Sequence, residues 1–449
     1  MAVPVHGSAG KMAGPMTRMR LLRITAFLAA VIAAEPSAAT AQASHDATFV
    51  FDRYMSPVAG ATNLLTIHRE LSRLEDGVLP LKVGAERRRL PLLAGIAYRA
   101  GKFIFLDVPQ DHMLLALGHE VFGHGTRLRE LGVGRIGYSF DAPPPYGGGG
   151  AVTSFEGEMP DTPLAFLTVS MAGIEAQHVM ADAIAERALA QGRWHYRDAW
   201  LYFENRDLAM SYMLDATERS AEGNDIADFT RSFKEACKLP ACSPITLRQI
   251  KRGALLTLGD PMLYYAMYGF AASYVAEGKA TSPVPMIPIG KGMHLLPSLG
   301  FQLTPFGTER LLRSAFRTDK TGAIGAIGAR GAMGAARITT VTLRVGDTGA
   351  STPWGLDVGA SDVRLYRALH ARVSVSVWRQ PPILSGQTSA PLKTGAAASA
   401  TMELPLRRFT RSDWLHATVT AGYKSEGFVP GDQLGRGAIL RIGLTALHH

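Results

Sequence analysis

The sequence predicts an α+β protein, in which a mainly helical region over residues 44–280 precedes an antiparallel β region over residues 281–449. In the first region apolar residues recur with the spacing of amphipathic helices, clearly over residues 63–74 and 162–190. In the second region Pro, Gly and Thr become frequent, and apolar and polar residues alternate with a period of two. The chain has 449 residues, of which 47% are hydrophobic and 19% charged, and this composition suits a globular protein with a large core.

The first 43 residues have the three parts of a secretory signal peptide. Four basic residues accompany the apolar run Ile24 to Ala34, and Ala41-Gln42-Ala43 forms a small-x-small cleavage site before Ser44. An uncleaved membrane anchor is the alternative, but the apolar run is short for a membrane span. We therefore expect an exported protein, located in the periplasm or outer membrane of a Gram-negative-type cell.

The net charge argues against a nucleic-acid partner. Removing residues 1–43 takes away four basic residues and one acidic residue, so the formal net charge falls from +9 to +6. The remaining chain is mildly basic and has no polybasic run with interleaved aromatic residues, which is the usual footprint of nucleic-acid binding.

The two cysteines, Cys237 and Cys242, are predicted to form a disulfide across a tight loop, as is usual in an exported protein. A thioredoxin-like redox pair would have two intervening residues, whereas this pair has four, including Pro240. Two cysteines alone do not make a zinc knuckle either.

Several elements are expected before the β region. Residues 47–51 should form a short strand, and residues 90–108 a hairpin with its turn at Ala100-Gly101-Lys102. The apolar segment at residues 254–276 is interrupted by Gly259-Asp260-Pro261, so it predicts core or membrane-surface helices rather than a membrane span.

One predicted helix contains the candidate metal-binding and catalytic residues. Apolar residues recur with helical spacing between Asp111, a candidate N-cap, and Gly132, a candidate C-terminal stop. Inside this helix His119-Glu120-Val121-Phe122-Gly123-His124 combines two imidazoles, which are good zinc ligands, with a carboxylate that can act as a general base.

The spacing of the two histidines requires an irregular helix. Zincins usually place their histidines four residues apart, whereas His119 and His124 are five apart, which leaves the rings about 140° apart on a regular helix. A one-residue bulge would restore the alignment, and such bulges cluster at functional sites. Gly123 stands where the backbone could most easily absorb it.

This six-residue pattern resembles the His-Glu-x-x-Gly-His motif of dipeptidyl peptidase III, a zinc peptidase of the gluzincin type. The resemblance implies that His119 and His124 bind zinc and that Glu120 is the catalytic base. In that family a glutamate on a later helix is the third ligand. The resemblance covers the motif and its helix only, and it implies a metallopeptidase-like helical domain over residues 44–280.

Glu175 is the predicted third metal ligand. It lies in an otherwise apolar helical run, where an unpaired carboxylate would be costly, and about fifty residues after His124, near the position of the second motif in the resembling family. The match there is partial, because the paired glutamates and the arginine of the family pattern are missing. His178 and Asp182 remain alternatives as ligands or as residues that orient a ligand histidine.

The segment between the motif and Glu175 suggests a place for substrate. Residues 151–155 look extended, and an edge strand beside a motif helix can pair with a peptide substrate. The four glycines at 147–150 form either a lid or a plain surface connection. Tyr138, Tyr146 and His178 are candidate oxyanion stabilisers by their neighbourhood alone.

The β region should contain six to eight strands. Period-two runs cover residues 341–346, 372–377, 415–422 and 439–446. Their apolar face lies opposite Arg, Thr and Gly, which fits an eight-stranded outer-membrane barrel and equally a soluble one-sided sheet.

These observations predict an exported zinc-dependent hydrolase, a metallopeptidase that acts on peptides or proteins, with Zn²⁺ held by His119, His124 and Glu175 and with Glu120 as base. A non-catalytic envelope barrel or scaffold with a closed four-ligand structural metal site is the first alternative. A binding module without metal is the second, and it requires a regular helix whose histidines point apart.

Overall fold

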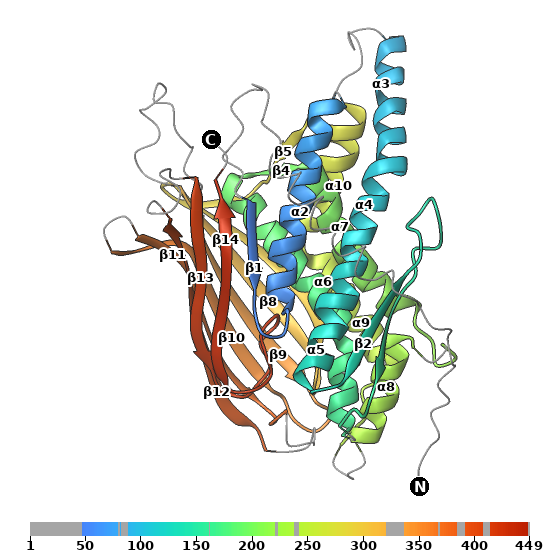
Figure 1. Ribbon diagram of the computed structural model, residues 1–449, viewed down its shortest axis with the longest axis vertical. Coiled ribbons are helices and arrows are strands. Elements are labelled where there is room, and N and C mark those ends of the chain that lie inside the picture. Colours follow the sequence, from blue (N-terminus) through green and yellow to red (C-terminus); the bar gives the residue numbers. More distant parts are fainter. Residues whose placement is uncertain are drawn as a thin grey trace. The chain divides into compact units, whose positions relative to one another are not determined.

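The computed structural model describes residues 47–449 except 80, 82–88, 161, 221–222, 238–241, 320–335, 367–368, 384–390, 407–413 and 448–449. The chain divides into two units, residues 1–42 and residues 43–449. The predicted signal peptide lies outside the described residues. Within the second unit a group of helices lies against one large antiparallel sheet (Figure 1).

The helical elements are α2 (Pro57–Val78), α3 (Arg89–Lys102), η1 (Phe103–Asp107), α4 (Val108–Leu117), η2 (Gly118–His124), α5 (Gly125–Glu130), α6 (Pro163–Gln191), α7 (Tyr196–Asp215), α8 (Asp225–Ala236), α9 (Leu247–Ala254), η3 (Leu255–Gly259), α10 (Pro261–Tyr268) and η4 (Gly269–Ala276). The strands are β1 (Ala47–Phe51), β2 (Arg135–Phe140), β3 (Ala151–Glu156), β4 (Arg193–His195), β5 (Thr281–Pro283), β6 (Ile287–Gly290), β7 (Met293–Thr304), β8 (Gly307–Thr318), β9 (Arg337–Asp347), β10 (Trp354–Tyr366), β11 (Leu369–Gln380), β12 (Lys393–Pro405), β13 (Leu415–Lys424) and β14 (Gly437–Ala446).

The predicted division into helices and an antiparallel sheet is confirmed. Ten strands form one sheet in the order β1-β14-β13-β12-β11-β10-β9-β8-β7-β6, and β7 to β14 are the eight long strands of a meander. All four predicted period-two runs lie on strands of this sheet. The sheet is open, because β1 and β6 do not pair, so the described residues do not form a closed barrel. The predicted strand at 47–51 is β1, which pairs with β14 at the opposite end of the chain.

The predicted hairpin at residues 90–108 is wrong. The chain is helical without interruption from α3 through η1, α4 and η2 to α5, so the motif helix begins far upstream of Asp111. A short apolar run fits a strand and a helix equally well by periodicity alone. Here packing decides, because Phe103 lies against the rings of Trp200 and Phe270, and Lys102 is bound to Asp107. The predicted C-terminal stop is correct, since Gly132 has a φ of 73° just after α5.

The long apolar helix α6 is the centre of the core. Its N-cap Thr162 accepts a hydrogen bond from the N–H of Ala165, and its end is marked by Gly192 with a φ of 69°. Its buried side chains join two apolar clusters, one with α7, α8 and α9 and one with α2, α4, α7 and α10. By length and composition α6 could cross a membrane, but 78% of its most apolar window is buried inside the protein.

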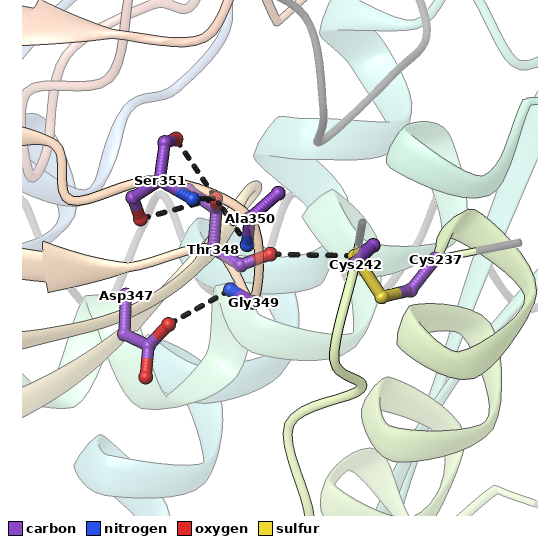
Figure 2. The surroundings of a disulfide bond; sticks show 7 residues. All are labelled: Cys237, Cys242, Asp347, Thr348, Gly349, Ala350 and Ser351. Atoms are coloured by element: carbon purple, nitrogen blue, oxygen red, sulfur yellow. Dashed lines mark hydrogen bonds between the residues drawn. A yellow bond between two sulfur atoms is a disulfide. The ribbon is translucent and has the colours of Figure 1, made fainter. Parts of the chain in front are cut away.

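The predicted disulfide between Cys237 and Cys242 is present, with the two Cα atoms 5.4 Å apart (Figure 2). Cys237 caps the C-terminus of α8. After Cys242 the chain pairs with the connection between β9 and β10, where the N–H of Ser243 donates to the carbonyl of Gly349 at 2.9 Å. The bridge therefore fixes the end of α8 beside the sheet.

Candidate metal centre

The predicted bulge is present at the histidine motif. Residues Gly118–His124 form a π-helix, η2, and the N–H of Gly125 reaches back five residues to the carbonyl of Glu120. In a π segment the residue five positions along takes the place that the fourth has in an α-helix. The rings of His119 and His124 therefore meet, with centroids 4.9 Å apart. A regular helix with divergent histidines, as a module without metal requires, is not what the chain forms.

Glycines on two helices allow the motif to pack closely against α6. A Cβ on Gly123 would lie 2.7 Å from the carbonyl oxygen of Ala172, and a Cβ on Gly173 would lie 2.2 Å from Nε2 of His119. Either distance is a severe overlap, so any larger residue would push η2 and α6 apart. Gly123 is therefore needed for the close approach to α6, a reason that the sequence does not reveal.

One carboxylate touches both histidines, and it belongs to Asp225. Its Oδ2 lies 3.0 Å from Nε2 of His119 and 3.2 Å from Nε2 of His124. Zinc bonds of about 2.0–2.1 Å in a tetrahedron separate neighbouring ligand atoms by about 3.3 Å. The oxygen of Asp225 is thus separated from each histidine nitrogen by about the distance expected between two ligands of one zinc ion. Asp225 is the first residue of α8, directly after the N-cap Asn224.

Glu120 also lies close to the histidines, and its carboxylate is bound by a residue of β3. One ligand atom from each of His119, Glu120 and His124 lies within 4.8 Å of the others. Oε2 of Glu120 accepts a hydrogen bond of 2.5 Å from the hydroxyl of Thr153 on β3. Two carboxylates therefore lie beside the histidine pair, and a single oxygen of Asp225 contacts both Nε2 atoms.

The second nitrogen of His124 is held by the protein. Nδ1 of His124 lies 2.8 Å from the carbonyl oxygen of Val169 on α6, so it must be the protonated nitrogen that donates. This contact fixes the direction of the ring and points Nε2 toward Asp225, so Nε2 is the nitrogen that carries the lone pair when the imidazole is neutral.

Tyr212 on α7 borders the centre. Its hydroxyl oxygen accepts the N–H of Asp225 at 3.1 Å, and its ring centroid lies 6.4 Å from that of His119. Burial and the nearby Asp225 raise the pKa of Tyr212, so the phenol keeps its proton near neutral pH. Neither Tyr212 nor Asp225 belongs to a sequence motif.

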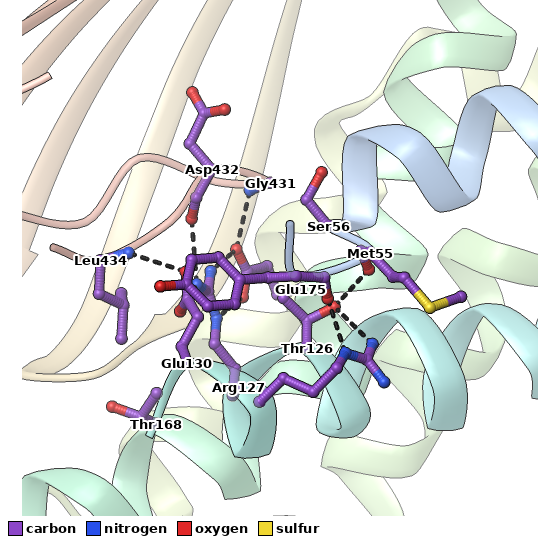
Figure 3. Close-up of polar contacts among 12 residues, drawn as sticks. Met55, Ser56, Thr126, Arg127, Glu130, Thr168, Glu175, Gly431, Asp432 and Leu434 are labelled. Atoms are coloured by element: carbon purple, nitrogen blue, oxygen red, sulfur yellow. Dashed lines mark hydrogen bonds and ion pairs between the residues drawn. The ribbon is translucent and has the colours of Figure 1, made fainter. Parts of the chain in front are cut away.

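Glu175, the predicted third ligand, does not belong to the cluster of His119, Glu120 and His124, and Figure 3 shows it beside Arg127 and Gly431 instead. Its carboxylate is buried and bound by Arg127, with Nη2 at 2.5 Å and Nε at 3.1 Å, and it accepts the N–H of Gly431 at 2.8 Å. The expectation that a buried carboxylate needs a partner was correct, but the partner is an arginine on α5 rather than a metal. Arg127 also binds Glu130 and the carbonyl of Asp432.

The alternative ligands also lie elsewhere. Asp182 pairs with Arg206 and with Arg313 of β8. His178 is buried, and burial together with Arg206 and Arg313 lowers its pKa to about 3, so it is neutral and takes no part in the described histidine cluster.

Two tyrosines predicted as oxyanion stabilisers have other partners. The hydroxyl of Tyr138 accepts a hydrogen bond from Arg129, and that of Tyr146 donates to the carbonyl of Phe105 at 2.7 Å. The glycine-rich connection is held by His112, whose Nε2 lies 2.8 Å from the carbonyl of Gly149.

The centre is partly open to solvent. The side chains of His119, His124 and Asp225 are 14%, 9% and 13% exposed. A hollow of about 260 Å³, lined by Trp200, Phe203, Met267, Phe270 and Ala271, lies away from these residues and is wholly apolar. The histidine cluster is therefore distinct from this hollow.

The pKa of His124 predicts a pH dependence of zinc binding. Burial would lower this pKa, but Asp225 opposes it and raises it to about 9, so the metal-free protein holds a proton on His124 below about pH 9. Zinc requires the neutral imidazole and must displace that proton. The association constant for zinc should therefore rise with pH, by up to about tenfold per unit, until about pH 9.

Competition with a chelator between pH 6.5 and 9 measures this slope. The raised pKa of His124 also stabilises the metal-free fold. This contribution to the free energy of unfolding is fully present below pH 6.5 and should be lost as the pH rises through about 9. An affinity that does not change over this range would contradict the assignment of His124 as a ligand paired with Asp225.

Comparisons with protein families, curated proteins and solved structures found no match to this chain. The motif resemblance therefore rests on six residues and does not identify a family.

Proposed function

We propose that this protein is a zinc-dependent hydrolase, and specifically a metallopeptidase, that acts outside the cytoplasm. The observation that carries the proposal is the bulged motif helix, which brings His119 and His124 to one oxygen of Asp225 at zinc-ligand spacing. Three protein ligands leave the fourth tetrahedral position open, as catalytic rather than structural zinc sites do.

Each neighbouring group then has a role. A zinc ion held here would supply a Lewis acid for water and for a carbonyl oxygen. Glu120 accepts the proton of the attacking water and delivers it to the leaving amine, while Thr153 fixes the direction of its carboxylate. Tyr212 donates its phenolic proton to the oxygen that becomes negative in the transition state.

The hairpin beside the centre favours an extended peptide as substrate. β2 and β3 pair only with each other in the described part of the chain, so β3 has an unpaired edge. β3 is mostly exposed and holds Thr153 against Glu120. A peptide that adds to this edge as a further strand would pass the base at hydrogen-bonding distance.

The proposed location follows from the signal-like residues 1–43, which favour export to the periplasm or outer membrane. The disulfide Cys237–Cys242 supports an oxidising compartment. No nucleic-acid partner is proposed.

A structural metal site in a non-catalytic envelope scaffold is the second candidate. The observation in its favour is that two carboxylates, from Glu120 and Asp225, approach the histidine pair. If both bind, the site has four protein ligands and is closed. His178, the fourth ligand that the sequence suggested for this case, does not contribute.

The variant Glu120→Gln separates the two candidates. A general base contributes about 10²–10⁴-fold to a rate, so the metallopeptidase should lose that factor in peptide hydrolysis while it keeps its zinc. Peptide-library cleavage and elemental analysis of the same preparation measure both quantities. The matched control is Glu277→Gln, because Glu277 is an exposed residue after η4, outside both the motif helix and β3, and should affect neither quantity. Loss of zinc from Glu120→Gln would instead favour the closed structural site.

A further inference from the structure

The large sheet exposes apolar side chains on the face that points away from the helices and buries polar and charged ones on the face toward them. This is the reverse of the usual arrangement in a soluble protein. The face that lies toward the helices is here called the inner face, since Arg313 and Arg372 on it pair with Asp182 and Glu186 of α6. The opposite, outer face contains every exposed large apolar side chain of strands β8 to β14. These are Leu312, Leu343, Val345, Trp354, Val358, Val375, Leu404, Tyr423, Leu440, Ile442 and Leu444.

The inner face carries buried polar and charged groups beside a few buried apolar residues such as Leu311, Ile338 and Trp378. Arg344 is 1% exposed and binds Glu309 at 3.2 Å and Asp357 at 2.7 Å. Lys424 is fully buried and donates to the carbonyl of Gly427 at 2.6 Å, and Arg441 binds Asp52 and Asp432. A soluble sheet with one covered face buries its apolar side, whereas here the apolar side is exposed.

Charged residues on the outer face are confined to its two ends. In the described strands β8 to β14 they are Arg310, Asp347 and Arg379 near one end and Arg337 at the other. Trp354 lies in the same cross-strand row as Arg379. An apolar band that ends in charged rims, with an aromatic residue at one rim, is what a bilayer interface selects.

The width of the band matches a membrane. On β9 the charges of Arg337 and Asp347 are ten residues apart, or about 33 Å along the strand. At a strand tilt of about 35–45° this corresponds to about 23–27 Å along the membrane normal, close to the apolar band of about 25 Å on outer-membrane sheets.

The apolar surface continues past β7, which pairs with the short edge strand β6 only near its start. A Cβ on Gly259 of η3 would lie 3.0 Å from the side chain of Leu299, so η3 packs directly on β7. The exposed Leu255 and Leu258 of η3 and the exposed Met267 of α10 extend the band onto the helices. At the other edge Phe51 of β1 is 65% exposed. The band thus covers the open sheet and the helices that adjoin its edge.

We infer that this band contacts the hydrocarbon of a lipid bilayer, so that the helical domain with its metal centre is carried on the inner face of a membrane-inserted sheet. A second copy of the chain is a poorer fit to the band, because the apolar residues span seven neighbouring strands with charges only at the rims, and no confined patch is set apart for a partner.

Two adjacent residues of β11 provide the test. Val375 is exposed on the outer face, and Ser374 is exposed on the inner face. Neither cysteine of the chain is free, so Val375→Cys and Ser374→Cys can each be spin-labelled singly in the full chain with its disulfide intact. The labelled proteins are reconstituted in phosphatidylethanolamine–phosphatidylglycerol vesicles, and collision rates with oxygen and with a water-soluble nickel chelate are compared.

The label at 375 should collide several-fold more often with oxygen than with the nickel chelate, and the label at 374 should show the reverse. Protection of the 375 label from both reagents would place it in a protein interface and overturn the inference. The inference would also be overturned if the wild-type protein stayed monomeric without detergent and did not associate with the vesicles. Neither readout depends on zinc or on hydrolysis.

Discussion

Asp225→Ala is expected to abolish zinc binding at micromolar zinc. Loss of an outer partner of a ligand already lowers metal affinity by about 10–100-fold, so loss of a direct ligand should exceed about 100-fold. The physical reason is that Oδ2 of Asp225 is the only carboxylate oxygen of the described residues with contacts of 3.0 and 3.2 Å to both histidines. Elemental analysis and competition with a chelator measure the change.

Two further variants make this result specific. Asp228→Ala removes a carboxylate one turn later on α8, which pairs with Arg231 instead, and should leave zinc affinity unchanged. Glu175→Gln should also retain zinc, since Glu175 is bound to Arg127. If Asp225→Ala kept its zinc and Glu175→Gln lost it, the ligand assignment would be wrong and the one expected from the motif resemblance would stand.

Arg127→Ala should lower the free energy of unfolding by about 3–5 kcal/mol, because it leaves the buried carboxylates of Glu175 and Glu130 without their cation. Arg127 also donates to the carbonyl of Asp432, so the connection between β13 and β14 loses one of its attachments to the motif helix and keeps that of Leu434 to Glu130. Urea unfolding of the purified mature protein, followed by circular dichroism, measures the loss.

The control for this variant is Arg231→Ala. Arg231 forms an i,i+3 pair with Asp228 in which both side chains are about a third or more exposed, and such pairs contribute about 0–1 kcal/mol. An equal effect of the two substitutions would show that the buried network around Glu175 does not stabilise the fold.

The sequence predicted the local geometry of the histidine cluster and missed the contribution of a distant residue. The five-residue spacing of His119 and His124 required a bulge, and η2 is that bulge. Asp225 could not be found in the same way, because it lies about a hundred residues later on a different helix and carries no motif. Its one signal is that it follows Asn224, a helix N-cap, which positions a carboxylate without specifying its target.

Glu175 shows why a chemical argument can select the wrong partner. A carboxylate in an apolar helix must be neutralised, but the sequence does not say by which cation. Arg127 lies within the motif helix itself. From the sequence alone, its charge fits a solvent-exposed position on that helix as well as a buried ion pair. Only the crossing of α5 and α6, made close by the glycines at 123 and 173, brings the two together.

The same distinction between local and distant features holds for the fold. Alternation of apolar and polar residues predicted the long strands, because that pattern depends only on neighbouring residues. It did not predict that β1 pairs with β14, nor that the sheet stays open, because both depend on contacts between distant parts of the chain. The hairpin at 90–108 failed for the same reason, since Phe103 packs on Trp200.

The central claim is that His119 and His124 form part of a zinc centre, and metal content tests it most directly. Elemental analysis of the mature protein, purified without chelators, is carried out for the wild type and for His124→Ala in parallel. We predict about one zinc per chain in the wild type and little in the variant. Absence of metal from both, after zinc has been offered back, would contradict the account and remove the basis for a hydrolase.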